Sequence, residues 1–300
     1  MAYTTINKST DYFNTKLYTG DASSSNAITG VGFEPSWTWL KGRNIAESHR
    51  LYDAVRGASN YITSNSTGAQ SNSIPLTSFN ADGFTIGTND DSVNGSYNYA
   101  SWNWKANGSG SSNTDGSITS TVSANTTSGF SIMTWTGTGS NGTIGHGLGK
   151  VPKMLIIKNT NNTQAWMVYH ASTGNNTEIQ FNATGPTAGS STAWQDTDPT
   201  SSVFYVSGSA GDSVNASGYT YVGYTGFKPA WVLLRNVNST QDWQVYTFDM
   251  QPFNEFCTTS AGRIKSNTSD AASTKTAMDM CSNGFKIRTN AADINASGNK

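Results

Sequence analysis

The sequence is poor in charged residues and has no long apolar run. Charged residues make up 12% of the 300 residues, and the formal net charge is −1. A near-neutral chain lacks the basic surface that nucleic-acid binding requires, so we expect no nucleic-acid partner. No stretch approaches the roughly twenty consecutive apolar residues of a membrane-spanning helix, so we expect no membrane insertion.

The sequence also lacks a secretion signal and a cysteine framework. The first residues do not combine a basic start with an apolar stretch, so we expect no signal peptide and synthesis in the cytoplasm. The two cysteines, Cys257 and Cys281, are too few for a disulfide framework. They could pair with each other, but two independent buried thiols is the preferred interpretation for a protein made inside a cell.

No motif with catalytic or metal-binding chemistry stands out. The histidines His49, His146 and His170 lack zinc-site spacing. The Asp90–Asp91 pair could bind calcium through its oxygens, but the rest of an EF-hand loop is missing and a solvated turn is the preferred interpretation. We therefore predict no catalytic residue, no metal and no cofactor. A carboxylate pair brought together by the fold would instead support glycoside cleavage, and the sequence cannot reveal such a pair.

Glycine, small polar residues and aromatic residues are abundant. The chain has 30 glycines, and aromatic residues make up 11% of it. This composition is typical of many short strands joined by tight turns. The aromatic content also excludes a disordered chain, because disordered chains lack apolar groups to bury. We therefore predict an all-β fold.

A proline-started segment occurs three times. Each copy has a proline, five residues rich in aromatic and branched apolar side chains, and a basic residue at position +6 from the proline. A histidine or tryptophan stands at +14 and a tyrosine at +17. In chain order the prolines are Pro35, Pro152 and Pro229, the basic residues Lys41, Lys158 and Arg235, the +14 residues His49, Trp166 and Trp243, and the tyrosines Tyr52, Tyr169 and Tyr246.

Each copy has the properties of a β-hairpin. Proline fixes φ and has no N–H donor, so it can start a strand but cannot sit inside a central one. The short aromatic and β-branched run after it suits a strand better than a helix. The residues from +7 to +13 are mostly turn formers that bond their own backbone. In the second and third copies nearly every strand residue is apolar, so we expect both strand faces to be covered.

Further strands are predicted around each hairpin. A strand ending in Thr-Gly precedes the first two hairpins, and a closing hairpin with an Asn-Gly or Asn-Ala-Ser-Gly turn ends each unit. An alternating strand follows the first two of these turns. The third unit lacks both the leading strand and the strand after its closing turn. The leading strands are residues 11–20 and those ending at Gly137, the turns lie at 94–95, 215–218 and 295–298, and the strands after the turns are 97–104 and 219–224.

These patterns predict tandem, related β-sandwich units of jelly-roll-like type. The segment between the first two units is rich in glycine, serine, asparagine and threonine and is predicted to be a linker, although residues 117–122 could form an edge strand. The predicted segments are unit 1 (1–106), a linker (107–128), unit 2 (129–225) and a partial unit 3 (226–300).

The aromatic residues have two interpretations. Those at fixed repeat positions are assigned to a core or an interface. Trp194 lies in a variable stretch outside the repeat, so it is the candidate for an exposed contact with a sugar or a protein partner. It is the one candidate binding residue that the sequence offers.

Several segments resemble proteins encoded by tailed phages of marine bacteria, and the resemblance covers nearly the whole chain. Such proteins are described as tail-fibre-like or virion structural proteins with β-sandwich domains. The resemblance implies a virion location and brings no catalytic residues. The chain departs from the pattern of these proteins in a short junction at 221–228 and in the missing last strand. The similar segments are residues 1–6, 11–20, 28–37, 82–88, 137–149 and 282–288.

The expected function is that of a tail or head fibre component that assembles with itself and adheres to host surface glycan or protein. Other virion proteins are expected partners. Self-association is expected because the incomplete third unit leaves a sheet edge that a neighbour could cover. Two alternatives stay open. One is a capsid decoration or filament-forming protein without a receptor role, and the other is a glycan-cleaving enzyme on a β-sandwich scaffold.

Overall fold

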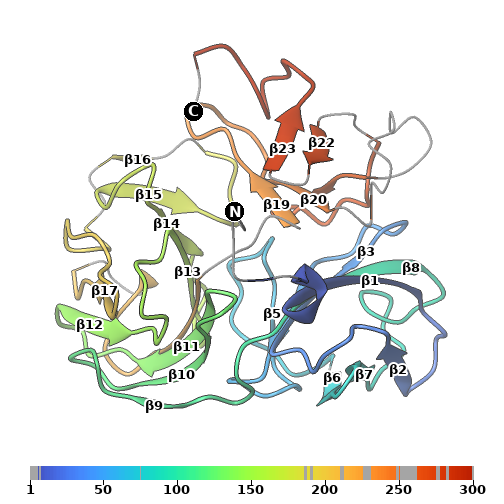
Figure 1. The fold of residues 1–300 in the computed structure, drawn as a ribbon, viewed down its shortest axis with the longest axis horizontal. Coiled ribbons are helices and arrows are strands. Elements are labelled where there is room, and N and C mark those ends of the chain that lie inside the picture. The colour runs from blue at the N-terminus through green and yellow to red at the C-terminus, as the bar shows by residue number, and fades with distance from the viewer. Residues whose placement is uncertain are drawn as a thin grey trace.

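The computed structural model is almost entirely β-structure, as predicted. Its described part contains the short 3₁₀ helix η1 (Ser9–Asp11) and antiparallel sheets in three groups that surround a common centre (Figure 1). The jelly-roll-like connectivity expected within each unit stays a prediction. The structure describes residues 6, 8–74, 76–185, 188–189, 192–209, 213–225, 231–247, 250, 262–274, 278–281 and 284–298.

Unit 1 consists of a five-stranded sheet and a smaller sheet over one of its faces. The five-stranded sheet has the order β1 (Phe13–Thr19), β8 (Asn98–Trp104), β3 (Trp37–Gly42), β4 (Arg50–Asp53), β5 (Tyr61–Ile62). The smaller sheet has the order β2 (Asn26–Thr29), β7 (Gly83–Ile86), β6 (Leu76–Asn80). Leu40 and Tyr52 of the first sheet share a buried cluster with Ile28 and Phe84 of the second.

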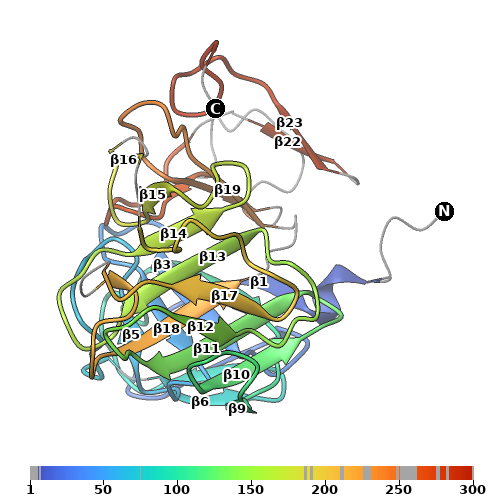
Figure 2. The same cartoon turned by 90° about the vertical axis from the view of Figure 1, so that its left-hand side faces the viewer.

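Unit 2 repeats this arrangement in an eight-stranded sheet, whose strands face the viewer in Figure 2. A two-stranded sheet of β12 (Gly142–Gly145) and β17 (Val203–Val206) accompanies it. The order of the eight strands is β16 (Ala188–Gly189), β15 (Thr177–Gln180), β14 (Met167–His170), β13 (Met154–Asn159), β18 (Thr220–Thr225), β11 (Phe130–Thr136), β10 (Ser120–Asn125), β9 (Ser111–Asn113).

The linker predicted at residues 107–128 is wrong. Strand β10 pairs with β11 over six residues, and β9 pairs with β10, so this segment extends the sheet of unit 2. Its residues are mostly small and polar, which is why the sequence did not indicate a strand of this length, yet Ser120, Val122 and Ser123 are all buried. Unit 2 is therefore taken as residues 107–225 below.

Unit 3 has a shorter set of strands. One sheet has the order β19 (Trp231–Leu234), β20 (Gln244–Thr247), β21 (Ile264–Lys265), and a second pairs β22 (Met278–Cys281) with β23 (Gly284–Ile287). Among the described residues of unit 3, no strand corresponds to β1 or β8 of unit 1. The start of the third proline segment, at Pro229, and the possible pairing of Cys257 with Cys281 lie outside the described residues.

The three hairpins predicted from the sequence are confirmed. Strand β3 pairs with β4, β13 with β14, and β19 with β20, all antiparallel. The alternating strands predicted after the first two closing turns are β8 and β18. Each lies beside the first strand of its own hairpin, with β8 on β3 and β18 on β13.

A glycine at the end of the leading strand allows close contact with the closing turn. The N–H groups of Gly20 and Gly137 bond to the carbonyls of Tyr97 and Tyr219, at 2.9 and 2.8 Å. A Cβ at either glycine would overlap a backbone carbonyl of the closing turn. The recurring Thr-Gly of the sequence thus reflects a contact that excludes every other residue.

The first hairpin strand of each unit separates two cores, which explains its apolar residues on both faces. Successive side chains of a strand point to opposite faces. Trp39, Ile156 and Leu233, all at +4, face a central core shared by the three units. Leu40 and Ile157, at +5, face the smaller core of their own unit.

Aromatic rings dominate the central core. Trp37 of unit 1 stacks on Tyr224 of unit 2, with ring centroids 4.4 Å apart. Trp39 contacts Phe181 of unit 2 at 5.7 Å and Trp231 of unit 3 at 5.6 Å. Such pairs contribute roughly 0.5–1.5 kcal/mol each beyond the apolar area that they bury. The three units therefore form one body and do not fold around separate cores alone.

A ring N–H at the +14 position joins each unit to one neighbour. Trp166 Nε1 of unit 2 donates to Thr63 O of unit 1 at 3.0 Å. Trp243 Nε1 of unit 3 donates to Gln180 O of unit 2 at 3.1 Å. The third such hydrogen bond runs from His49 of unit 1 to Lys265 O of unit 3. The three contacts together join the three units in a closed circle, and we call each of them a joint.

These acceptors are equivalent positions. In each unit the residue whose carbonyl accepts the ring hydrogen bond directly follows an isoleucine. This isoleucine lies on the strand after the hairpin and pairs with the residue before the +17 tyrosine. The paired isoleucines are Ile62, Ile179 and Ile264. The backbone N–H of each +14 residue in turn donates to an asparagine three positions after that isoleucine, namely Asn65, Asn182 and Asn267, at 3.1, 2.8 and 2.9 Å.

We predict that Trp166→Phe destabilises the protein by about 0.5–1.5 kcal/mol more than Trp135→Phe does, because only the first change removes hydrogen bonds from the ring to carbonyls of the neighbouring unit. Trp135 is a matched control, since it is also buried and its Nε1 has no hydrogen-bond partner. Urea unfolding monitored by circular dichroism measures both changes. Equal losses of stability would mean that the ring hydrogen bond does not hold the units together.

Candidate functional site

The lysine at +6 is buried in units 1 and 2 and closes the hairpin loop. Lys41 Nζ donates to Gly42 O at 2.9 Å and to Ile45 O at 3.4 Å. Lys158 Nζ makes the same two contacts, to Asn159 O at 2.6 Å and Asn162 O at 3.3 Å. Burial lowers the pKa of each lysine to about 8. These ammonium groups bind backbone carbonyls and are not free to bind a substrate.

In units 1 and 3 the basic residue at +6 also donates hydrogen bonds to backbone carbonyls of a neighbouring unit. Lys41 Nζ donates to Ser269 O of unit 3 at 3.3 Å. Arg235 of unit 3 donates to the carbonyls of Ala183 and Gly185 in unit 2, and its guanidinium lies 5.0 Å from the centre of the Trp243 ring. Like the ring N–H groups, these contacts run from unit 1 to unit 3 and from unit 3 to unit 2.

His49 is a neutral histidine in the joint between units 1 and 3. Trp39 Nε1 donates to His49 Nδ1 at 2.7 Å. Since an indole nitrogen only donates, Nδ1 is the acceptor, and Nε2–H donates to Lys265 O at 2.9 Å. Burial, with a smaller contribution from the charge of Lys41, lowers the pKa of His49 to about 3. His49 is fully buried and thus occupies a packing position, as Trp166 and Trp243 do at +14 of the other two units.

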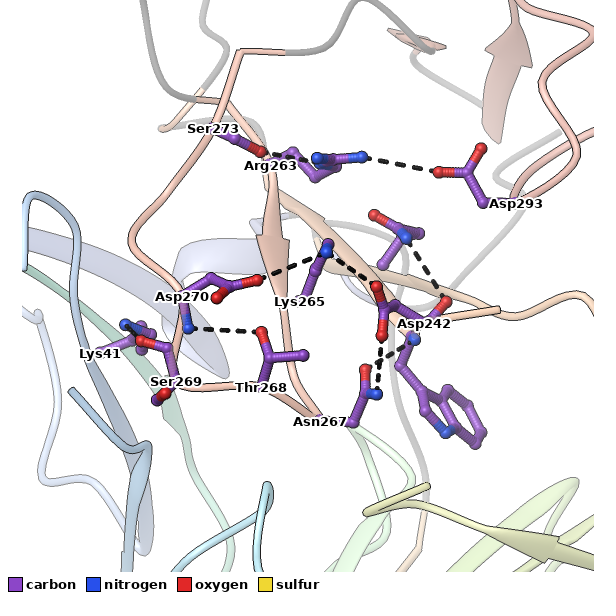
Figure 3. Close-up of polar contacts among 12 residues, drawn as sticks. Lys41, Asp242, Arg263, Lys265, Asn267, Thr268, Ser269, Asp270, Ser273 and Asp293 are labelled. Atoms are coloured by element: carbon purple, nitrogen blue, oxygen red, sulfur yellow. Dashed lines mark hydrogen bonds and ion pairs between the residues drawn. The ribbon is translucent and has the colours of Figure 1, made fainter. Parts of the chain in front are cut away.

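A network of charged residues surrounds this joint in unit 3 (Figure 3). Lys265 Nζ contacts Asp242 at 2.8 Å and Asp270 at 3.4 Å. Arg263 pairs with Asp293 at 3.5 Å. Figure 3 places Lys41 beside the loop that carries Asp270, so the network lies where unit 3 meets unit 1.

The carboxylates of this network are poorly suited to acid–base catalysis. Burial alone would raise the pKa of Asp242, but hydrogen bonds from Lys265 and Asn267 outweigh burial and lower it. Glycoside cleavage needs one carboxylic acid with a raised pKa beside an ionised partner. Here two carboxylates share one lysine, and the pKa of Asp242 is lowered, not raised. The arrangement has the chemistry of a structural joint.

A second buried network joins units 1 and 2. Arg56 Nε contacts Asp53 Oδ2 at 2.5 Å, and both side chains are almost fully buried. Tyr224 OH of unit 2 donates to the same Asp53 oxygen at 2.6 Å. Gln70 also accepts a hydrogen bond from Arg56 at 3.0 Å. Each charge is satisfied within the protein, and removing one partner would leave the other buried and unpaired.

The prediction that Trp194 is an exposed contact residue is wrong. Its side chain is 2% exposed and lies in the core of unit 2. The Trp194 ring contacts the Tyr169 ring edge to face at 5.8 Å. Trp194 lies outside the repeated segment, and its ring nevertheless fills the core of unit 2. The contact residue that the sequence offered for adhesion is therefore not available at the surface.

The other residues considered in the sequence have structural contacts. His146 is buried, its Nδ1 accepts from Leu148 N at 3.2 Å, and burial lowers its pKa. Asp90 accepts from Ser92 N at 2.8 Å and forms a turn. Among the described residues, no group of three His, Cys, Asp or Glu side chains could hold a metal ion, and no helix is long and apolar enough to cross a membrane.

A groove of about 480 Å³ lies between units 2 and 3 and is lined mainly by apolar side chains. All four residues of β19 line it, together with Met154 at the start of β13. Val151 and Phe285 stand beside it with 46% and 41% of their surface exposed. They are the exposed large apolar side chains in the part of the chain that the structure describes.

Comparison with known proteins places the chain in a family. A family model described as a domain of unknown function (DUF7483) matches residues 8–224 and again residues 213–300. The chain belongs to the DUF7483 family. The second match begins at the closing turn of unit 2 and continues through unit 3. No curated protein and no solved structure matches this DUF7483 chain.

We predict that acid weakens this DUF7483 protein at the His49 joint. The folded-state pKa of about 3 lies below the ordinary value of 6.5, so the unfolded chain binds a proton more readily. The contribution of neutral His49 is complete above pH 6.5 and is lost as pH falls toward 3, at up to about 1.4 kcal/mol per pH unit.

The test compares the wild type with a double variant, Trp39→Ile with His49→Trp, which copies the Ile156–Trp166 pair of unit 2. Urea unfolding between pH 7 and pH 4 should show a smaller loss of stability in the variant. Burial also lowers the pKa of His146, so His146 keeps part of the acid sensitivity in both proteins. An unchanged pH dependence in the folded variant would contradict the assignment.

Proposed function

We propose that this chain is a non-enzymatic structural subunit of a larger particle, which contacts its neighbours through the groove beside β19. The observation that carries the proposal is the position of the exposed apolar residues. Val151 and Phe285 stand together at this groove, on a surface where other large apolar side chains of the described residues are covered. Exposed apolar patches of this kind mark interaction sites.

The way in which the protein pairs its buried charged side chains supports an assembly role over catalysis. The buried cations at +6 bind backbone carbonyls, and the buried Asp53 is held by Arg56 and Tyr224. Lys265 is shared by two carboxylates of unit 3, Asp242 and Asp270. Two of these contacts, from Lys41 to Ser269 and from Tyr224 to Asp53, hold units against each other, and such interlocked units suit a component that transmits contacts within a particle.

The resemblance to phage proteins makes the virion the proposed location. Within that setting, a tail or head fibre component and a capsid decoration or filament-forming protein are both assembly roles. Trp194 was the residue that the sequence offered for contact with host glycan, and its burial removes that candidate. We therefore give assembly, with copies of itself or with other virion proteins, precedence over receptor binding.

We predict that the purified chain self-associates at micromolar concentration and that Val151→Asp with Phe285→Asp shifts it toward the monomer. Two carboxylates in the groove would have to lose their water on contact, which is costly. Size-exclusion chromatography with light scattering gives the mass. The control is Asn72→Asp, which adds a charge at an exposed position of unit 1. A wild type that stays monomeric, or a variant that associates equally well, would count against self-assembly through the groove.

A further inference from the structure

A second pocket, of about 480 Å³, lies where units 1 and 2 meet, and we call it the joint pocket. Its volume falls within the range of roughly 300–1,000 Å³ that is typical of small-molecule sites. Its lining is mainly polar, unlike that of the groove beside β19. The polar lining residues are Arg56 and Gln70 of unit 1 and Thr134, Thr160, Asn161 and Thr220 of unit 2.

The sheet of unit 2 changes from an apolar to a hydroxyl-bearing face as it reaches this pocket. Ile132 of β11 and Val222 of β18 belong to the central core. Thr134 and Thr220 lie two residues away on the same two strands, so their side chains point to the same face of the sheet. The face that packs against the aromatic core therefore ends in two threonine side chains at the joint pocket.

The equivalent place between units 1 and 3 can be compared with it position by position. Both places contain the same backbone hydrogen bond, from Gln70 N to Thr160 O at 2.8 Å and from Ala272 N to Arg43 O at 2.9 Å. Gln70 and Ala272 each lie eight residues after the isoleucine that precedes the acceptor of the joint. Thr160 and Arg43 both stand at +8 from the proline.

This comparison shows that the fold does not require the polarity of the joint pocket. Between units 1 and 3, apolar side chains of the central core stand in place of three of the polar lining residues. The longer side chain of Arg43 stands in place of Thr160. The three apolar replacements are Met250 for Arg56 at +21, Ala272 for Gln70, and Leu17 for Thr134 three residues before the glycine of the leading strand.

The charge at the joint pocket is already paired within the protein. The described lining residues carry a single charge, on Arg56, whose guanidinium forms the ion pair with the buried Asp53. Four of the five N–H groups of this guanidinium donate to Asp53, Gln70, Leu51 and Tyr224. The fifth, on Nη1, has no partner among the described residues. The pocket therefore offers one further N–H group but no unpaired charge that would hold an anion.

The remaining polar groups suit the hydroxyl groups of a ligand. The side-chain amide nitrogens of Gln70 and Asn161 have no hydrogen-bond partner among the described residues, although the oxygens of both amides accept. The hydroxyls of Thr134 and Thr220 have none either. Thr160 Oγ1 donates to Thr220 O at 2.9 Å and can still accept. Since a sugar hydroxyl both donates and accepts, it can pair with these amides and with these hydroxyls.

We propose that the joint pocket binds a neutral sugar ring, whose hydroxyls pair with these groups and whose C–H groups contact Val55, Ala69 and the threonine methyls. The sugar hydroxyls replace the hydrogen bonds of the water that they displace. The described lining residues include no aromatic ring for stacking, so a single pocket binds at about millimolar affinity. The joint pocket is separate from the groove beside β19, so this ligand is additional to the proposed assembly role and independent of it.

The test titrates the full chain with the methyl glycosides of glucose, galactose and mannose and, separately, with inorganic phosphate, followed by NMR. At least one glycoside should shift the side-chain amide signals of Gln70 and Asn161 saturably, and phosphate should not. The free hexoses are titrated in parallel. Binding of either form supports the inference, and the comparison distinguishes a site for free sugar from one for a sugar within a glycan. Saturation by phosphate, or no shift of these signals with any sugar, would overturn it.

Two variants at Thr134 locate the sugar site. Thr134→Val removes one hydroxyl at almost constant shape and should weaken binding about two- to tenfold. Thr134→Leu copies Leu17 of unit 1 and should abolish binding without loss of stability, because leucine already occupies the equivalent position. The control is Thr29→Leu, at an exposed strand position that does not line the pocket, and it should bind the sugar as the wild type does.

A further comparison separates this inference from the proposed function. The groove variant, Val151→Asp with Phe285→Asp, should bind the sugar as the wild type does. Sugar binding that survives Thr134→Leu, or that is lost in the folded groove variant, would place the site elsewhere and reject the joint pocket. A wild type that stays monomeric but binds the sugar at Gln70 and Asn161 would count against self-assembly through the groove and support the sugar site.

Discussion

The contact on which the structure depends is the hydrogen bond from the ring at +14 to a backbone carbonyl of the adjacent unit. It occurs three times and always runs in the same direction around the centre, from His49 to unit 3, from Trp243 to unit 2 and from Trp166 to unit 1. A buried carbonyl without a donor costs roughly 1–3 kcal/mol. Each unit therefore supplies a donor to one neighbour and an acceptor to the other, so no unit can be removed without leaving unpaired groups on both sides.

This circular arrangement explains why the first hairpin strand is apolar on both faces. One face must contribute to the shared aromatic core, where Trp37 and Trp39 meet rings of the other two units. The opposite face must bury the smaller sheet of its own unit, as Leu40 does against Phe84. The buried lysines fit the same logic. A strand covered on both faces leaves its last side chain no path to solvent, and the carbonyls of the following loop take the place of water.

Local features of the fold could be predicted from the sequence, whereas the long-range pairing could not. The equal offsets from Pro35 and Pro152 gave the hairpins, because hairpins form between neighbours in sequence. Strand β9 was missed, and β10 was anticipated only as a possible edge strand at 117–122, because the residues of both strands are mostly small and polar. Trp194 was misplaced for a related reason, since its burial depends on Tyr169 from a distant strand. The recurring ring at +14 predicted that His49, Trp166 and Trp243 occupy equivalent positions, but it did not predict which unit each ring contacts.

The incomplete third unit is compatible with a closed circle because the joints use only part of each unit. The ring at +14, its asparagine partner and the acceptor carbonyl all belong to the hairpin and the strand after it, which unit 3 retains in Trp243, Asn267 and Lys265. The strands that cover the other edge of the hairpin, β8 and β18, contribute to sheet pairing instead. Among the described residues of unit 3 no strand corresponds to β8 or β18, and the joints do not require one, because their donors and acceptors lie on the hairpins and on the strand that follows each hairpin.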